Sequence, residues 1–346
     1  MNILLLTRYH RLAASSRVRF LQYLPALEAA GHRVEVRPLL SEAYVRALYG
    51  GGTGGGGRGR LAIAAAYLRR IGDLATATAD LIWLEKEALP FVPAWLERLF
   101  WRRPVAVDLD DAVFHRYEAI PGLAGKIDGV MARAGLVVAG NAYIAERAAA
   151  AGARRVEMLP TVVDLGHYPA LPPAGQGFTI GWIGSPVTAP YLEAVRPALS
   201  ALVREGARLL LIGAGEAALP GLPAERRPWR EEREAADLAE IDVGIMPLPD
   251  LPFERGKCGY KLIQYMAAGR PTVASPVGVN AALADGGRSG LLPGSAAEWT
   301  AALRALRDDP DRRIAMGAAG RALVERHYCL AVAAPRLVSL LESARA

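Results

Sequence analysis

Two of the chain's few lysines lie four residues apart in the glycine-rich stretch GKCGYK, residues 256–261. The chain has only four lysines among 41 Lys plus Arg: Lys86, Lys126, Lys257 and Lys261. The stretch precedes a short predicted helix over about residues 260–268, which Gly269 and Pro271 end. A helix N-terminus offers unpaired N–H groups and a partial positive charge, and glycines allow a ligand close approach to the backbone. Two cations there oppose the helix dipole unless an anion binds, so the stretch predicts a diphosphate site rather than a solvated basic helix start.

A second candidate site is the acidic sequence Asp108-Leu109-Asp110-Asp111, at the end of the predicted strand PVAVDLD. Three carboxylates so close together repel one another unless they are paired or bind something. We expect Asp110, or His115 four residues beyond Asp111, to bind a sugar or to accept a proton from an acceptor hydroxyl. The alternative is that Asp110 caps a short helix and His115 lies at the surface. Glu85 and Lys86 end the neighbouring predicted strand and are expected to face the same site.

These residues lie in a chain whose length and pattern predict two α/β domains. A chain of 346 residues, 52% hydrophobic and 22% charged, is typical of a globular protein with two cores. Short apolar strands alternate with amphipathic helices in both halves. The predicted strands of the first half are MNILLLT, HRVEVRPL, ADLIWLE, PVAVDLD and LVVAG, and those of the second are FTIGWIG, ARLLLIG, VGIMPL and TVASPV. The predicted helices cover residues 16–30, 61–77, 93–101, 126–134, 142–151, a segment ending at 205, 232–239, 260–268, 296–308, 311–328 and 331–346.

Two such βαβ series indicate two Rossmann-like, doubly wound parallel-sheet domains that face a central cleft. Proline-rich residues 159–173 form the predicted linker. We therefore expect a first domain over residues 1–168 and a second over 175–330, with the last helix, 331–346, packing back on the first. Residues 50–60, GGGTGGGGRGR, are predicted to form a flexible loop, either a disordered insertion or a mobile lid.

The amino-acid composition limits which compartments and binding partners are expected for this chain. The two cysteines, Cys258 and Cys329, give no disulfide framework and no metal-ligand spacing, so we expect a reducing cytoplasmic location and no bound metal. The N-terminus lacks the pattern of a signal peptide, and no apolar run is long enough to span a bilayer. A net charge of +6 indicates anionic partners, but no basic run is interleaved with aromatics in the manner of a single-strand binder, so we do not expect a nucleic-acid partner.

The segment GKCGYKLIQYMAAGRPTVASPVG resembles the donor-binding motif of GT-B glycosyltransferases, specifically the retaining family 4 of group 1. In that family a glycine-containing loop leads into a helix similar to E-A-M-A-x-G-x-P-V-V. The resemblance extends to DVGIMPLPD, to GFTIGWIGSP and to LPTVVD in the linker. It implies a retaining, metal-independent hexosyltransferase that takes its sugar from a nucleoside-diphosphate sugar, with UDP or GDP as the nucleotide and no further cofactor.

The sequence departs from the family at the charged positions. The second of the family's two glutamates, which binds the donor ribose, is Gln264 here, and the first falls on Gly256, with Glu254 and Arg255 just before it. The Arg and Lys that the family has after the first strand of this domain are absent, and GSPVT, residues 184–188, offers a hydroxyl and amides but no charge. The resemblance therefore implies that Gly256, Lys257, Lys261 and Ser185 bind the diphosphate. It gives the ribose and sugar to Gln264, Glu254 and Arg255.

Two further expectations follow from the resemblance. Trp229 lies where the family's loops hold the nucleobase, so it either stacks on the base or is simply buried. Ser16, Arg17 and Arg19 open the first helix, where the family has a Gly-Gly loop facing donor phosphates or acceptor. There Ser15 or Ser16 can cap the helix and Arg17 can bind phosphate, or the serine is only a cap and Arg17 a surface residue.

Three rival functions remain open. Asp108-Leu109-Asp110 could be the metal-binding Asp-x-Asp of a GT-A transferase. The same fold could instead catalyse sugar-nucleotide epimerisation or hydrolysis, or the chain could be a degenerate sugar-nucleotide-binding subunit. The acceptor is open as well: the basic charge favours a lipid-linked or phosphorylated acceptor and peripheral association with the inner membrane face, whereas a polysaccharide or a small molecule also fits.

Overall fold

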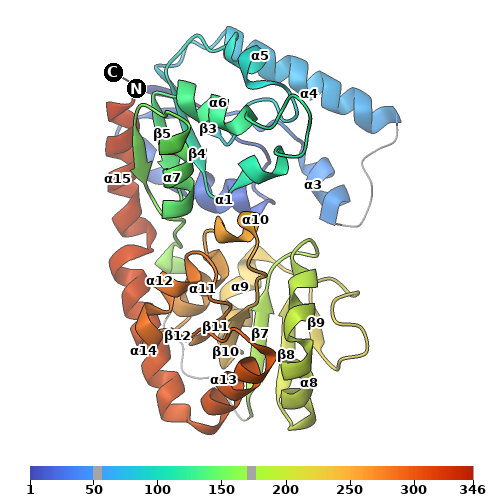
Figure 1. Ribbon diagram of the computed structural model, residues 1–346. Helices are drawn as coiled ribbons and strands as arrows, with labels where there is room; N and C mark the ends of the chain where they lie inside the picture. Colours follow the sequence, from blue (N-terminus) through green and yellow to red (C-terminus); the bar gives the residue numbers. More distant parts are fainter. Residues whose placement is uncertain (50–56, 170–176, 346) are drawn as a thin grey trace. The chain divides into compact units, whose positions relative to one another are not determined.

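The computed structural model describes residues 1–49, 57–169 and 177–345 and divides into two compact units (Figure 1). The first unit comprises Met1–Val162, Gly256–Cys258 and Leu330–Ala346. The second comprises Val163–Arg255 and Gly259–Cys329.

The first unit is built on a six-stranded parallel sheet in the order β2-β1-β3-β4-β5-β6. Its strands are β1 (Asn2–Leu6), β2 (Arg33–Val36), β3 (Leu81–Glu85), β4 (Val105–Leu109), β5 (Leu136–Ala139) and β6 (Val156–Met158). The central strands β3, β4 and β5 are buried along their whole length, as expected for a parallel sheet covered by helices on both faces.

The helices of the first unit are α1 (Ala14–Arg19), α2 (Leu24–Ala29), α3 (Glu42–Tyr49), α4 (Gly57–Ala75), α5 (Ala94–Arg98), α6 (Lys126–Arg133), α7 (Ala142–Ala150) and α15 (Leu330–Ser343). Short 3-10 turns lie at Leu21–Tyr23 and Val113–Arg116. The last helix, α15, packs on this sheet: Leu337 and Leu341 are buried in one cluster with Ile3 and Trp83.

The largest differences between predicted and observed helices lie in the first unit. The single helix predicted over residues 16–30 is broken into α1, a 3-10 turn and α2, because Phe20 leaves helical geometry and Pro25 starts a new helix. The glycine-rich loop predicted over residues 50–60 is helical from Gly57 onward, and residues 50–56 lie outside the described residues. Helix propagation from the amphipathic residues beyond Leu61 outweighs the low helix propensity of glycine at that end.

The second unit has a six-stranded parallel sheet in the order β9-β8-β7-β10-β11-β12. Its strands are β7 (Thr179–Ile183), β8 (Arg208–Ile212), β9 (Glu225–Arg227), β10 (Val243–Met246), β11 (Thr272–Ala274) and β12 (Gly290–Leu291). The sequence predicted the four inner strands but missed β9 and β12. These edge strands are two or three residues long, and β9 consists entirely of charged residues.

Helices flank this sheet as well: α8 (Arg196–Arg204), α9 (Glu234–Ala239), α10 (Pro252–Arg255), α11 (Tyr260–Ala267), α12 (Asn280–Leu283), α13 (Ala296–Asp308) and α14 (Pro310–His327). Four 3-10 turns complete the unit, at Leu165–His167, Ala189–Val195, Glu231–Arg233 and Asp285–Gly287. In the part of the chain that the structure describes, no helix combines the length and apolarity that crossing a membrane requires.

Helix α14 supports α11 through two glycines. A Cβ atom added at Gly317 would lie 2.1 Å from the carbonyl oxygen of Gly269, and one at Gly320 would lie 2.8 Å from Cγ of Met266. The backbone of α14 thus touches the residue that ends α11, so the two helices are held in one position.

We expect Gly317→Ala to lower the free energy of unfolding by about 1–3 kcal/mol, because the new methyl group overpacks against backbone that cannot move aside. The matched control is Gly72→Ala on α4, where an added Cβ meets no atom within 4 Å. That variant should be more stable by about 0.5–1 kcal/mol. Urea denaturation of both variants checks the pair, and a neutral Gly317→Ala would contradict the close packing.

Candidate functional site

The strand order of the second unit defines where a ligand can bind. The order reverses between β7 and β10, and in open parallel sheets the crevice beyond the carboxyl ends of the strands at this point takes the ligand. The segments that follow these two strands are the GSPVT loop after β7 and the loop with α10 and α11 after β10. Both contain residues predicted to bind a diphosphate.

Lys261, in the first turn of α11, reaches across to the end of β7. Its Nζ atom lies 5.3 Å from the ring centre of Trp182, and a Cβ added at Gly184 would lie 2.9 Å from its Cε atom. Gly259 precedes the helix in the left-handed conformation, at φ 68°, and no side chain caps the helix N-terminus. The charge of Lys261 therefore lies beside the GSPVT loop, which has no charged side chain of its own.

The loops after β7, β8 and β9 converge at this point. A Cβ added at Gly213 would lie 2.3 Å from the carbonyl oxygen of Gly184 and 3.0 Å from Cβ of Trp229. Trp229 is half-buried and lies against the apolar cluster that contains Leu262 and Ile263 of α11. The structure thus brings Lys261, Gly184 and Trp229 together at one edge of the sheet.

A hydrogen-bond chain links Gln264 to Trp229. Gln264 is 3% exposed, and its Nε2 atom lies 3.5 Å from the hydroxyl of Tyr168. That hydroxyl donates to Glu234, and the indole Nε1 of Trp229 donates to the other carboxylate oxygen of Glu234 at 2.7 Å. Burial, reinforced by the neighbouring Tyr260 and Glu234, raises the pKa of Tyr168 well above its usual value, so it remains a neutral donor.

Sequence reasoning missed Tyr168 and Glu234. Tyr168 lies in the predicted linker, and Glu234 is one of several glutamates in the charged stretch REEREAAD. Neither has a spacing that indicates a site. Only the placement of Glu234 in the first turn of α9 distinguishes it from its neighbours.

The remaining donor-side residues are more dispersed. Glu254 is buried and accepts a hydrogen bond from the hydroxyl of Tyr191. Arg255 ends the helix α10 instead of lying in a loop, and its guanidinium is 2.6 Å from the carboxylate of exposed Asp250. The amide of Ser185 lies 3.4 Å from the hydroxyl of Thr188. Gly256 and Lys257 belong to the first unit, and Lys257 is half-buried.

In the first unit, the order β2-β1-β3 places the corresponding switch point between β1 and β3. There the carboxylate of Glu85 accepts hydrogen bonds from Ser15 at 3.2 Å, from Ser16 at 2.7 Å and from the amide of Arg8 at 2.8 Å. This corrects the expectation that Ser15 or Ser16 caps the first helix. The helix begins at Ala14 without a side-chain cap.

Lys86 and Asp110 form a buried ion pair between the ends of β3 and β4. Their charged atoms are 2.9 Å apart, and Glu85 lies 4.0 Å from the same ammonium. Burial by itself would raise the pKa of Asp110, but the Lys86 ammonium outweighs this effect and the pKa is lowered. Lys86 has a φ of 62°, a left-handed conformation that is strained for a non-glycine residue.

Arg19 and Asp108 form a second buried pair, and this corrects the expectation that Arg19 faces a phosphate. The guanidinium of Arg19 lies 2.6 Å from the Asp108 carboxylate, and both side chains are 1% exposed. The indole of Trp83 also donates to Asp108, at 3.3 Å. Burial raises the pKa of Asp108 to about 6, although Arg19 opposes the rise. Arg19 and Asp108 therefore belong to the core of the first unit.

His115 and Arg17 are held by other partners. The ring nitrogens of His115 lie 3.0 Å from Glu118 and 2.9 Å from the hydroxyl of Tyr143, so both are engaged. Arg17 is mostly buried and donates to the carbonyl oxygen of Arg11 at 3.2 Å. His115 thus does not share a contact with Asp110 among the described residues.

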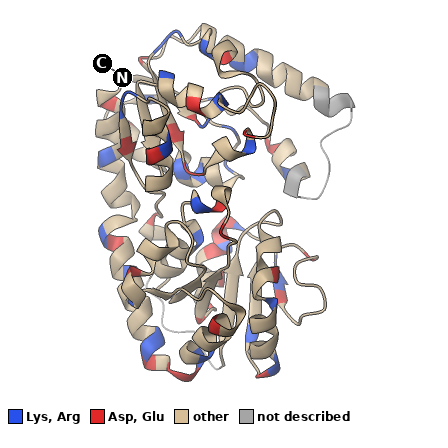
Figure 2. Cartoon of the chain, viewed as in Figure 1, with Lys and Arg blue, Asp and Glu red and all other residues tan. Residues whose placement is uncertain are grey.

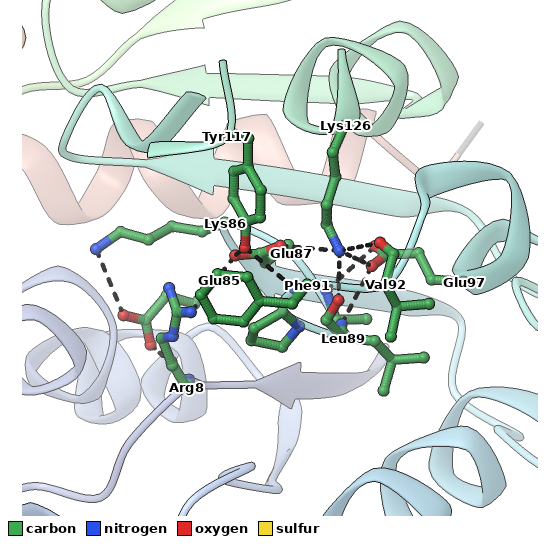
Figure 3. Close-up of polar contacts among 12 residues, drawn as sticks. Arg8, Glu85, Lys86, Glu87, Leu89, Phe91, Val92, Glu97, Tyr117 and Lys126 are labelled. Carbon is green, nitrogen blue, oxygen red and sulfur yellow. Dashed lines mark hydrogen bonds and ion pairs between the residues drawn. The ribbon is translucent and has the colours of Figure 1, made fainter. Parts of the chain in front are cut away.

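Lys126 is the centre of a buried network that fixes the loop after β3 (Figure 3). Its ammonium lies 2.9 Å from Glu87 and 3.2 Å from Glu97, and it donates to the carbonyl oxygens of Leu89 and Val92. Further contacts to Glu87 come from the Tyr117 hydroxyl at 2.6 Å and from Arg8 at 3.5 Å. Within the described residues, no group of three or more His, Cys, Asp or Glu side chains could hold a metal ion.

Comparison with known proteins identifies the fold. Residues 178–309 match the family model described as Glycosyl transferases group 1, which confirms the predicted resemblance for the second unit. No curated protein matches the chain.

Among solved structures, HepE of Anabaena in complex with UDP-glucose is similar at 16% identity, with a TM-score of 0.75, over 99% of this chain and 100% of that one. Sucrose-phosphate synthase from Thermosynechococcus elongatus is similar at 15% identity and a TM-score of 0.73, over 99% and 98%. A structure described as trehalose-6-phosphate from E. coli bound with UDP-2-fluoro glucose is similar at 16% identity and a TM-score of 0.65, over 99% of each chain.

The chain thus has the predicted GT-B fold, and its second unit has the sequence pattern of a group 1 glycosyltransferase. The two parallel sheets also exclude the hypothesis of a GT-A transferase, because that fold has a different architecture around its Asp-x-Asp sequence.

The ion pair of Lys86 and Asp110 makes stability depend on pH. We expect Asp110→Asn to lower the free energy of unfolding at pH 7 by about 3–5 kcal/mol, because the ammonium stays buried without its partner. The folded-state pKa of Asp110 is lowered, so its contribution is present above the unfolded value of about 3.9 and is lost as pH falls through the folded value. In urea denaturation the difference in the free energy of unfolding between wild type and variant should therefore become smaller below about pH 4. Asp311→Asn, at an exposed position on α14, is the control, and an equal gap at pH 7 and pH 3 would contradict the pairing.

Proposed function

We propose that this chain is a retaining, metal-independent glycosyltransferase of family 4 that moves a hexosyl group from a nucleoside-diphosphate sugar to an acceptor hydroxyl. The observation that carries the proposal is the position of Lys261. Its ammonium lies at the switch point of the second sheet, beside the glycine loop after β7 and at the uncapped N-terminus of α11. A diphosphate there meets both the positive end of a helix and the ammonium of Lys261.

This arrangement suits the step in which the bond from sugar to diphosphate breaks. Negative charge then grows on the leaving diphosphate, and fixed positive charge beside it lowers the barrier. Lys261 and the N–H groups of α11 supply that charge, with Ser185, Gly256 and Lys257 as the further diphosphate ligands. HepE has been solved with UDP and with UDP-glucose, which favours UDP over GDP as the nucleotide. No further cofactor is proposed.

The nucleoside end of the donor is assigned to Trp229, Gln264 and Glu234. Trp229 stacks on the base, while Gln264, Glu254 and Arg255 serve the ribose and sugar as the family pattern implies. Glu234 adds what Gln264 lacks, a carboxylate. Among the described residues no cation lies within ion-pair distance of Glu234, and each of its oxygens keeps a lone pair beyond the bonds from Tyr168 and Trp229. We assign these free positions to the ribose diol.

The acceptor is assigned to the first unit, at the switch point between β1 and β3. Asp110 is kept ionised by Lys86 and can accept a proton or a hydrogen bond, with His115 as the second candidate. Ser16, which donates to Glu85, and Arg17, the next residue on α1, are assigned to the acceptor side. The acceptor class is a lipid-linked sugar, a polysaccharide or a small molecule, and the protein is proposed to act in the cytoplasm or at the inner membrane face.

The donor assignment is tested by a thermal-shift screen against UDP, GDP, ADP and dTDP, in which one nucleotide should raise the Tm. With that nucleotide, Lys261→Ala should weaken diphosphate binding about 10- to 100-fold, equivalent to about 1.5–3 kcal/mol, and leave binding of the matching nucleoside unchanged. Arg288→Ala is the control, because this arginine is exposed and pairs only with Asp285 in the described structure. Equal losses for nucleotide and nucleoside would contradict the phosphate role. With the donor identified, retention is read from the anomeric configuration of the product.

The role of Glu234 is tested by ribose discrimination. Glu234→Gln keeps the shape of the side chain but removes the charge, and we expect about tenfold weaker binding of the ribonucleoside diphosphate with little change for its 2′-deoxy analogue. Glu232→Gln, at an exposed position two residues earlier, is the matched control. A variant that weakens both nucleotides equally would show that Glu234 only supports Trp229.

A further inference from the structure

The first unit carries a surface that the proposed reaction does not use, and five large apolar side chains on it are exposed. They are Leu61 (74%), Leu68 (71%), Phe91 (64%), Trp95 (60%) and Leu99 (57%). Three exposed arginines, Arg69, Arg102 and Arg103, belong to the same segments. We call this surface the apolar-basic face. It consists of α4 together with the segment from residue 90 to residue 103, which includes α5.

Two hydrogen bonds place the segment 90–103 beside α4. The Tyr67 hydroxyl on α4 donates to the carbonyl oxygen of Pro90 at 2.7 Å. Arg103 donates to the carbonyl oxygen of Ala77, just beyond α4, at 3.1 Å. The segment 90–103 therefore runs alongside α4 from its middle to its end, and Figure 1 shows α4 and α5 together at one end of this unit.

The exposed side of α4 is an apolar stripe with helical periodicity. Leu61, Ala65, Leu68 and Ala75 recur at intervals of three, four and seven residues, and all four are exposed. The helix is drawn almost entirely in tan in Figure 2, with few charged positions along its described length. A helix of an isolated globular unit normally turns such a stripe inward, whereas here Tyr67 and Ile71 pack on the core and the stripe faces outward.

The backbone holds Phe91 outward at an energetic cost. Phe91 has a φ of 59°, a left-handed conformation that costs a non-glycine residue about 1–2 kcal/mol. Its amide donates to the Tyr117 hydroxyl at 3.3 Å, and Tyr117 in turn donates to Glu87 (Figure 3). The exposure of this ring is therefore fixed by the buried network around Lys126.

The exposed charged side chains on this face all carry positive charge. From residue 61 to residue 103 no acidic side chain is exposed. Glu85, Glu87 and Glu97 are buried in the networks described above. Asp73 and Asp80 are half-buried, near Arg37 and the amide of Asn2 respectively. The exposed surface is consequently apolar and positive.

We propose that the apolar-basic face docks on an anionic phospholipid bilayer. Trp and Phe rings favour the headgroup region, leucines insert into the acyl boundary, and arginines bind phosphate while their stems remain in apolar surroundings. Anionic lipid complements a face without exposed carboxylates, and each arginine adds about 1 kcal/mol near such a surface. A two-fold contact between copies would instead bring arginines against arginines. The inference does not depend on the proposed reaction, because it concerns residues outside both assigned sites.

The experiment is vesicle co-sedimentation of the full chain. Wild type should bind vesicles of phosphatidylcholine with about 30% phosphatidylglycerol at least tenfold more tightly than pure phosphatidylcholine vesicles, and the binding should weaken as salt is raised. Phe91→Gly combined with Trp95→Ser should reduce binding at least tenfold, since two rings no longer insert. Glycine suits the left-handed φ at position 91, so this variant should remain folded. Arg102→Glu should reduce binding to the anionic vesicles about tenfold and leave binding to the neutral ones unchanged.

The matched control is Ile314→Ser, which removes an exposed apolar side chain (53%) from α14 of the second unit and should bind vesicles as wild type does. Circular dichroism and the nucleotide thermal shift establish that every variant is folded. No binding of wild type to anionic vesicles would overturn the proposal. So would vesicle binding by the Phe91/Trp95 variant equal to that of wild type. A wild-type dimer that these substitutions dissociate, without vesicle binding, would assign the face to a second copy of the chain instead.

Discussion

The buried ammonium of Lys126 is the constraint on which the first unit depends most. It holds two carboxylates, Glu87 and Glu97, and two backbone carbonyl oxygens in a region from which water is excluded. Without this cation, two buried charges would have only Arg8 nearby, a loss that typically costs several kcal/mol. Because the loop after β3 is fixed in this way, Lys86 at its start meets Asp110 and Phe91 at its middle is displayed to solvent. One buried charge thus positions both the candidate acceptor site and the apolar-basic face.

The second unit relies on backbone proximity instead of buried charge. Gly184 and Gly213 allow the loops after β7 and β8 to touch. The side chain of Lys261 lies against Gly184, and that of Trp229 lies against Gly213. Helix α11 is held against α14 through Gly317, so the N-terminus of α11 stays aligned with the switch point of the sheet. The four lysines therefore fall into two pairs, one in each of two different surroundings. Lys86 and Lys126 stabilise the first unit, whereas Lys257 and Lys261 flank the start of α11.

Most of the fold could be predicted from the sequence, because parallel strands and their helices leave a strong apolar period. The strands at the centre of each sheet, and helices such as α13, appear where they were expected. The failures have local causes. Strand β9 is three charged residues long, and the first helix breaks at Phe20, five residues before the proline that starts α2. Similarly, the glycines before residue 61 concealed the start of α4.

The sequence by itself determined the two βαβ series and the lysine-bearing motif at α11, because periodicity, glycine spacing and charge are local properties of a chain. Tertiary structure decided which charged residues pair with one another in the core. Arg19 and Asp108 were candidate site residues in the sequence, but in the structure they lie in the core and pair with each other across distant elements. Glu234 and Tyr168, unremarkable in the sequence, were brought to Gln264 by the fold. Pairing over such separations depends on strand order and helix packing, which no local pattern specifies.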